Sequence, residues 1–223
     1  MFATIKRFWD RDGFLSVLLA VLALSLYVAL PVAGGPMFGV IGEVVMSLVL
    51  LSGLFVVASQ HARLRPAIVF VAGAIALGWL AEIGHHPIAT RGALALNLVY
   101  LSAMVVVVLE RVMRSGRVTV HRINGAIAAY LLLAVLFANA FSLVEHLHPG
   151  SFQGLKVTGA WGGFLYFSQV TLFTVGYGDI TPVTSGARSL AMLEGLIGQL
   201  FPAVLLARLV ALGIEDRRSV PRP

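Results

Sequence analysis

The sequence contains no cysteine and few charged side chains. Without cysteine, neither a disulfide nor a cysteine-ligated metal site can form. Charged residues make up 12% of the 223 residues, against about 25% in an average soluble domain, while 59% are hydrophobic. These proportions argue against an ordinary soluble fold and predict a protein built from membrane helices.

Long apolar stretches recur along the chain. One of them, Ala160–Phe173, is too short to cross a bilayer and suits a re-entrant helix, while the first follows basic residues as a signal peptide does. Because Pro31–Gly35 is a poor cleavage site, we expect the first stretch to remain a membrane helix. We predict an all-α membrane protein with six transmembrane helices, each near the ~17–25 residues that span a bilayer: Phe14–Leu30, Phe38–Ser59, Ala67–Ile83, Gly92–Leu109, Ile123–Val144 and Ala187–Leu212.

The basic residues that give the formal charge of +6 are unevenly placed. With a cytoplasmic N-terminus, Arg91, Lys156 and Arg188 fall on the outer side. The bias toward the inner side predicts a multi-pass protein of the cell membrane, surrounded by lipid, with both termini cytoplasmic. It accounts for the charge without a nucleic-acid partner. The inner side receives thirteen basic residues: Lys6, Arg7, Arg11, Arg63, Arg65, Arg111, Arg114, Arg117, Arg122, Arg208, Arg217, Arg218 and Arg222.

The chain divides into two halves. Residues 1–13 form a cytoplasmic N-terminus, 14–110 a four-helix unit, 111–122 a basic cytoplasmic linker, 123–212 a second helical unit and 213–223 a polar tail that we expect to be frayed. The tail is too short for a soluble regulatory domain. We expect turns at Pro31–Met37, Gln60–Pro66 and Gly84–Arg91, and an outer loop at Glu145–Gly159.

The most informative segment is Thr174-Val175-Gly176-Tyr177-Gly178-Asp179. Its two glycines alternate with larger residues, and glycine adopts positive φ at little cost. A short stretch of this kind can turn successive carbonyls to one side, which a regular strand cannot do because its pleat alternates. Such a row of carbonyl oxygens can replace the hydration shell of a cation without adding a fixed charge.

This motif and its flanking helices resemble the potassium channel superfamily, and more narrowly its six-helix bacterial members with one pore motif per chain. The likeness implies a homotetramer in the bacterial inner membrane, since each chain supplies a quarter of the selectivity filter. It implies that K⁺ ions are bound by carbonyl oxygens of Thr174, Val175, Gly176 and Tyr177, that Thr174 adds its hydroxyl, and that no other cofactor is needed. Gly178 and Asp179 complete the filter. Phe173 departs from the family, which usually has threonine there.

Two residues of the preceding helix are predicted to support the filter, Tyr166 and Thr171. Tyr166 stands eight residues before Thr174, where many relatives place an aromatic donor to the aspartate after the filter. We therefore expect a hydrogen bond from the Tyr166 hydroxyl to Asp179, with simple packing of Tyr166 as the alternative. The C-terminus of this helix carries roughly −0.5 elementary charge and would favour a cation in the cavity beyond it.

The last helix is predicted to line the cavity and hold a gate. Gly198 stands where relatives carry a hinge glycine, and Pro202 breaks a backbone hydrogen bond one turn later. The alternative is that Gly195 and Gly198 permit close helix packing. Glu194 is expected behind the filter with a hydroxyl or backbone partner, or in a watery crevice. The cavity face is predicted to comprise Gln199, Ala203, Leu206 and Val210.

The fourth helix carries no basic residue between Arg91 and Arg111. A voltage sensor needs several, because each charge crossing 100 mV supplies only ~2.3 kcal/mol. We therefore predict a voltage-sensor-like unit without gating charges and weak voltage dependence.

Three functions are weighed. The leading one is a passive potassium-selective channel, with a weakly selective cation channel as its variant. A potassium-transporter subunit is the second, although such proteins usually fuse four degraded pore units in one chain. The third is a membrane enzyme or scaffold, but its candidate polar residues form no catalytic or metal-ligand pattern: Glu43, Glu82, His85 and His86.

Overall fold

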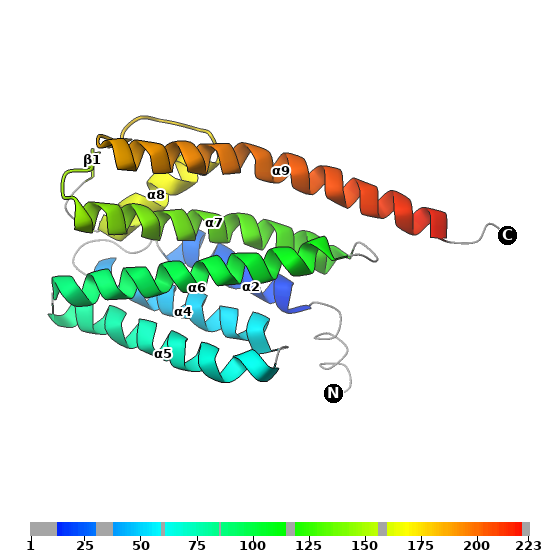
Figure 1. Cartoon of the computed structure of the whole chain (residues 1–223), viewed down its shortest axis with the longest axis horizontal. Helices are drawn as coiled ribbons and strands as arrows, with labels where there is room; N and C mark the ends of the chain where they lie inside the picture. Colours follow the sequence, from blue (N-terminus) through cyan, green and yellow to red (C-terminus); the bar gives the residue numbers. More distant parts are fainter. Residues whose placement is uncertain are drawn as a thin grey trace.

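The computed structural model describes residues 13–29, 38–58, 61–84, 86–114, 119–155 and 160–219. Helices dominate these residues, as Figure 1 shows. In chain order the elements are α2 (Gly13–Leu24), continued by the π-helical turn η1 (Ser25–Ala29), α4 (Phe38–Ala58), α5 (His61–Gly84), α6 (Pro87–Met113), α7 (Val120–Leu147), β1 (Phe152–Gln153), α8 (Ala160–Leu172), β2 (Thr181–Pro182) and α9 (Ser185–Ser219).

Helix α7 is the central element of the bundle. It packs against α2, α6, α8 and α9, and its middle is lined by small and apolar residues that are almost fully buried. Gly125 lets Leu15 of α2 approach, since an added Cβ would lie 2.7 Å from the leucine side chain. The first helical unit therefore packs beside the second helical unit of the same chain.

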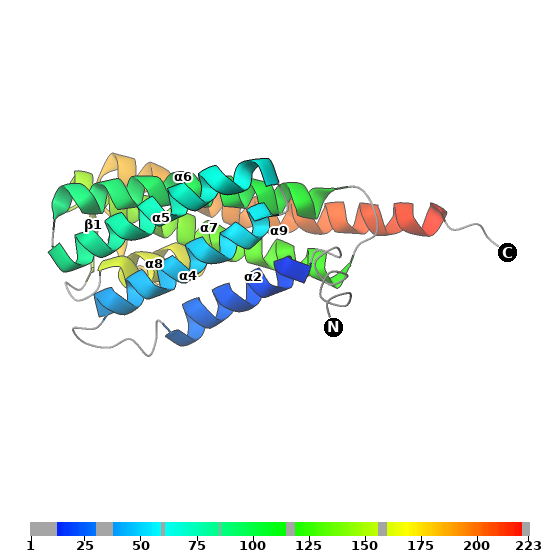
Figure 2. The same cartoon turned by 90° about the horizontal axis from the view of Figure 1, so that it is seen from below.

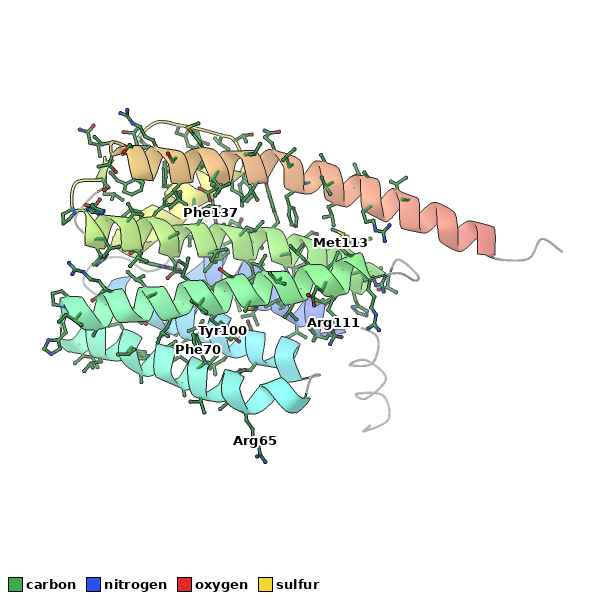
Figure 3. All side chains as sticks on the ribbon, in the orientation of Figure 1. Arg65, Phe70, Tyr100, Arg111, Met113 and Phe137 are labelled. Atoms are coloured by element: carbon green, nitrogen blue, oxygen red, sulfur yellow. The ribbon has the colours of Figure 1, made fainter. Side chains whose placement is uncertain are left out.

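Helices α4 and α5 lie on the other side of α6 from α9 (Figures 1 and 2). Helix α5 packs against both α4 and α6. The rings of Phe70 and Tyr100 stack between α5 and α6 with their centroids 6.4 Å apart (Figure 3). Tyr100 also donates a hydrogen bond to the Leu50 carbonyl of α4, at 2.9 Å. This hydrogen bond gives the polar hydroxyl a partner inside the apolar bundle.

Within the described residues, four helical segments are long and apolar enough to cross a membrane: Ala67–Gly84, Pro87–Met113, Val120–Leu147 and Ser185–Arg208. Gly13–Tyr27 and Gly39–Leu54 are shorter apolar segments. The all-α membrane fold is supported, while the crossing of six helices stays a prediction.

Several predicted boundaries are wrong. Helix α5 begins at His61, inside the turn expected at Gln60–Pro66. Helix α6 begins at Pro87, because proline is well suited to the first position of a helix, where its missing N–H removes no hydrogen bond.

The linker and the tail are also shorter than expected. Helix α6 runs to Met113 and α7 starts at Val120, after Thr119 caps its first turn. Helix α9 continues to Ser219, so the tail expected to be frayed from residue 213 is largely helical. The C-terminal end of α9 extends beyond the other helices (Figure 1). The turn expected at Pro31–Met37 lies outside the described residues.

Candidate functional site

The motif follows α8 directly and folds back over its C-terminal end. The Val170 carbonyl accepts hydrogen bonds from the N–H groups of Val175 (2.9 Å) and Gly176 (3.3 Å). The Thr174 N–H donates to the Thr171 carbonyl at 3.0 Å. These bonds satisfy carbonyls that a helix end leaves without partners. The predicted short helix before the motif is confirmed, and it ends at Leu172.

The backbone of the motif alternates in handedness. Thr174 has φ of 58°, Gly176 of 61° and Gly178 of 78°, so every second residue is left-handed. A backbone that alternates in this way can turn successive carbonyls toward one side, which is the arrangement expected from the two glycines. Thr174 joins the pattern without being glycine, and a β-branched residue at positive φ is strained by about 1–3 kcal/mol. The surrounding bonds of Val170 and Thr171 hold it there.

Tyr166 of α8 faces the residue that follows the two glycines. A side-chain hydrogen bond with Asp179 is the first cause of the raised pKa of the Tyr166 hydroxyl. The contact relates α8 to the Asp179 end of the motif, between the two residues that the resemblance to potassium channels paired. Both side chains are exposed in the single chain.

The outer end of the motif is tied to the loop after α7. Strands β1 and β2 pair antiparallel, with Phe152 opposite Pro182. Gly154 has φ of 84°, and a Cβ there would lie 1.9 Å from the Asp179 carbonyl oxygen. Only glycine permits this approach. The loop therefore packs directly on the backbone that ends the motif.

Two further features hold this loop. The Glu145 carboxylate accepts hydrogen bonds from the N–H groups of Gly150 (2.8 Å) and Phe152 (3.2 Å). The Phe152 ring belongs to a cluster of edge-on rings in which contacting centroids lie 5.0–5.6 Å apart. The other rings come from α7 and α8: Phe141, Phe164 and Phe167. Sequence reasoning placed a loop here but did not identify Glu145 as its cap.

Glu194 of α9 is completely buried against α8. Its Oε1 contacts the Ser168 hydroxyl, which also lies 2.8 Å from the Ala134 carbonyl of α7. The predicted hydroxyl partner of Glu194 is confirmed, and it belongs to the helix that precedes the motif. Ser168 thereby connects three helices through one hydroxyl.

Gly198 lies where α9 crosses the end of α8. A Cβ there would lie 2.2 Å from the Leu172 carbonyl oxygen, so the two backbones touch. Among the described residues of the single chain, no atom outside its own stretch of helix lies within 4 Å of a Cβ built at Gly195. Close packing within the chain therefore accounts for Gly198 and not for Gly195, while the hinge stays a prediction. Pro202 lies inside α9, as expected.

Tyr130 of α7 reaches the same crossing point, and sequence reasoning missed it. Its hydroxyl lies 2.9 Å from the Leu172 carbonyl oxygen and 3.2 Å from the Gly198 carbonyl oxygen. Its ring lies 5.5 Å from Phe173 and 5.3 Å from Phe201, between centroids. The signal for this residue was the departure at Phe173, whose ring packs on Tyr130.

The predicted cavity residues share an exposed surface of α9. Gln199, Ala203, Leu206 and Val210 are all exposed in the single chain, and so is the motif from Thr174 to Asp179. In the apolar stretch of α9 that could cross a membrane, only 11% of the residues are buried, against 67% in the corresponding stretch of α7. An apolar helix and a filter-like backbone are thus left uncovered by the rest of the chain.

Two residues of the enzyme or scaffold alternative, Glu43 and Glu82, lie close together where α4 packs on α5. Glu43 lies over Gly78 of α5 and Glu82 over Gly39 of α4, where a Cβ would meet their carboxylates at 2.5 and 2.0 Å. His85 lies outside the described residues. Within the part of the chain that is described, no group of three or more His, Asp or Glu side chains is placed to hold a metal.

The fourth helix ends in a fixed arginine. The Arg111 guanidinium lies 5.4 Å from the centroid of the Phe14 ring, in the last turn of α6 (Figure 3). A cation over an aromatic face is held by the ring's charge distribution. The contact joins the C-terminal end of α6 to the N-terminal end of α2.

Comparison with known proteins supports an ion channel. Residues 127–215 match the family model described as Ion channel. Protein LctB of Bacillus caldotenax is 50% identical over 46 residues, or 21% of this chain and 34% of that protein. Protein LctB of Geobacillus stearothermophilus is 52% identical over 46 residues, which again make up 21% of this chain and 34% of that protein. Two pore potassium channel c of Oryza sativa subsp. japonica is 39% identical over 84 residues, or 37% of this chain and 17% of that protein.

The chain thus spans about a third of the LctB proteins and less of the rice channel. No solved structure matches. The matched region begins in α7 and ends in α9, so it contains the motif and all the contacts around it. These findings support a membrane protein with an ion-channel domain and point away from an enzyme.

Proposed function

We propose that this protein is a potassium-selective channel that conducts K⁺ passively through a ring of four filters. The observation that carries the proposal is the left-handed backbone at Thr174, Gly176 and Gly178. It lies within a domain similar to ion channels, and one relative is a two pore potassium channel.

The filter backbone supplies the chemistry. Moving a monovalent cation from water into a medium of low dielectric constant costs on the order of 20 kcal/mol by the Born estimate. Carbonyl oxygens from Thr174 to Tyr177, with the Thr174 hydroxyl at the inner end, replace the water that the ion loses. Since these oxygens carry no net charge, the ion leaves as readily as it binds. The K⁺ ions are the transported substrate.

Four copies of the chain are needed to close the ring. One copy supplies one filter strand, and its filter and α9 are exposed. In the tetramer the exposed face of α9 that contains Gln199 and Leu206 lines a cavity. The C-terminal ends of four α8 helices point toward it, and together they idealise to about −2 charges, which favours a cation.

The first unit acts as a collar around the pore. It packs on α7 through α2 and α6, and its fourth helix lacks gating charges between Arg91 and Arg111. Transmembrane voltage therefore does little work on it. The N-terminus, the linker and the end of α9 lie on the cytoplasmic side, and the loop that contacts Asp179 lies outside.

A potassium-transporter subunit is the competing proposal. Single-channel recording of the purified protein in planar bilayers separates the two. A channel gives discrete unitary currents, whereas transporter turnover is too slow for a resolvable step. Unitary K⁺ currents support the channel, and K⁺ uptake without unitary currents supports the transporter.

A further inference from the structure

Two backbone carbonyls meet at one point between the filter and the inner helix. Pro202 has no N–H, so the Gly198 carbonyl, four residues earlier in α9, has lost its donor within the helix. Leu172 is the last residue of α8, where a carbonyl also lacks a partner within its helix. At Gly198 the backbone of α9 lies directly against the Leu172 carbonyl oxygen.

A single hydroxyl serves both carbonyls. Tyr130 lies 2.9 Å from the Leu172 oxygen and 3.2 Å from the Gly198 oxygen. A tyrosine hydroxyl has one hydrogen, so it donates fully to one carbonyl at a time. A movement of α9 at Pro202 that changes the distance from the Tyr130 hydroxyl to the Gly198 oxygen also changes how often that hydroxyl donates to the Leu172 oxygen instead.

The ring of Tyr130 makes the same connection through packing. It contacts Phe173, the residue directly before Thr174, and Phe201, the residue directly before Pro202. A shift of the α9 backbone at Phe201 is therefore transmitted through the tyrosine ring to the inner end of the filter. The hydroxyl and the ring of Tyr130 therefore both link α9 near Pro202 to the backbone just before the filter.

We propose that Tyr130 is a positioning residue that couples movement of α9 at Pro202 to the inner end of the filter. The proposal rests on the proposed channel function. Pro202 then has an effect beyond its own helix. The Gly198 carbonyl, which it leaves without a helical donor, accepts a hydrogen bond from Tyr130, and Tyr130 also contacts the inner end of the filter.

The test is a double-mutant cycle on channel open probability. Tyr130→Phe keeps the ring and removes the hydroxyl. Pro202→Ala restores a backbone N–H to the Gly198 carbonyl, so the hydroxyl is no longer needed there. A typical hydrogen bond is worth about 0.5–1.5 kcal/mol, which corresponds to about a twofold to twelvefold change in an equilibrium. We expect Tyr130→Phe to change the open probability by a factor in this range, and by a clearly smaller factor in the Pro202→Ala background.

The matched control is Tyr100→Phe, which removes a buried hydroxyl bonded to the Leu50 carbonyl at the same 2.9 Å but outside the pore half. Its effect is expected to be equal with and without Pro202→Ala. If Tyr130→Phe does not assemble like the wild type, 3-fluorotyrosine at position 130 replaces it in the cycle, since it alters the donor and keeps the ring.

Failure of the proposed channel function and failure of this inference give different results. If the wild-type protein conducts no K⁺, the proposed function fails before the cycle begins. If it conducts, and the hydroxyl at position 130 has the same effect in both proline backgrounds, the residue is merely structural and this inference is overturned.

Discussion

The left-handed backbone of the filter can be tested without removing any contact. At Gly178, φ is 78° and a Cβ would meet no atom within 4 Å in the part of the chain that the structure describes. Gly178→Ala therefore adds conformational strain and no clash within the chain. An L-residue in the left-handed region is disfavoured by about 1–2 kcal/mol. If the strain adds over four copies, the conducting ring is disfavoured by about 4–8 kcal/mol, or at least about a thousandfold in population.

The assay is K⁺ efflux from liposomes that contain equal amounts of protein, with assembly checked by size exclusion. Gly186→Ala is the matched control, because a Cβ at Gly186 also meets no atom within 4 Å and the residue lies in the first turn of α9 with ordinary helical φ. We expect Gly178→Ala to abolish efflux and Gly186→Ala to preserve it. Wild-type efflux and selectivity in Gly178→Ala would refute the role given to this backbone.

Other predictions concern the contacts around the filter. Tyr166→Phe removes the partner of Asp179 and should speed the loss of current during sustained opening; unchanged kinetics in patch recordings would count against the brace. Ser168→Ala should lower the stability of the protein in thermal unfolding by about 1–3 kcal/mol, because it leaves the buried Glu194 carboxyl without its hydroxyl. The exposed control Ser102→Ala should change little. The conductance–voltage curve should be shallow, and a steep curve that survives neutralising Arg111 and Arg114 would contradict the account of the first unit.

The conformation at Gly176 and Gly178 could be predicted because glycine is the residue that tolerates positive φ. Thr174 could not be predicted in the same way, since its side chain disfavours this conformation and only the hydrogen bonds at Val170 and Thr171 hold it. The partner expected for Tyr166 came from the resemblance to potassium channels over one short segment. Local sequence is informative where the interacting groups lie within a few turns of each other.

Contacts between distant segments were harder to foresee. Tyr130 reads in the sequence as one more residue of an apolar helix, and its two carbonyl partners come from α8 and α9. The choice between hinge and packing at Gly198 also depended on how closely another helix approaches. Helix ends were misplaced because polar residues such as those after Gly213 suit a helix that leaves the membrane as well as they suit a tail.

The central claim is that these backbone oxygens select potassium. The most direct test is the reversal potential of the reconstituted protein, with K⁺ on one side of a bilayer and Na⁺ at equal concentration on the other. The account predicts a reversal far toward the potassium equilibrium potential. A reversal near zero would show that both ions pass alike and would contradict a potassium-selective filter.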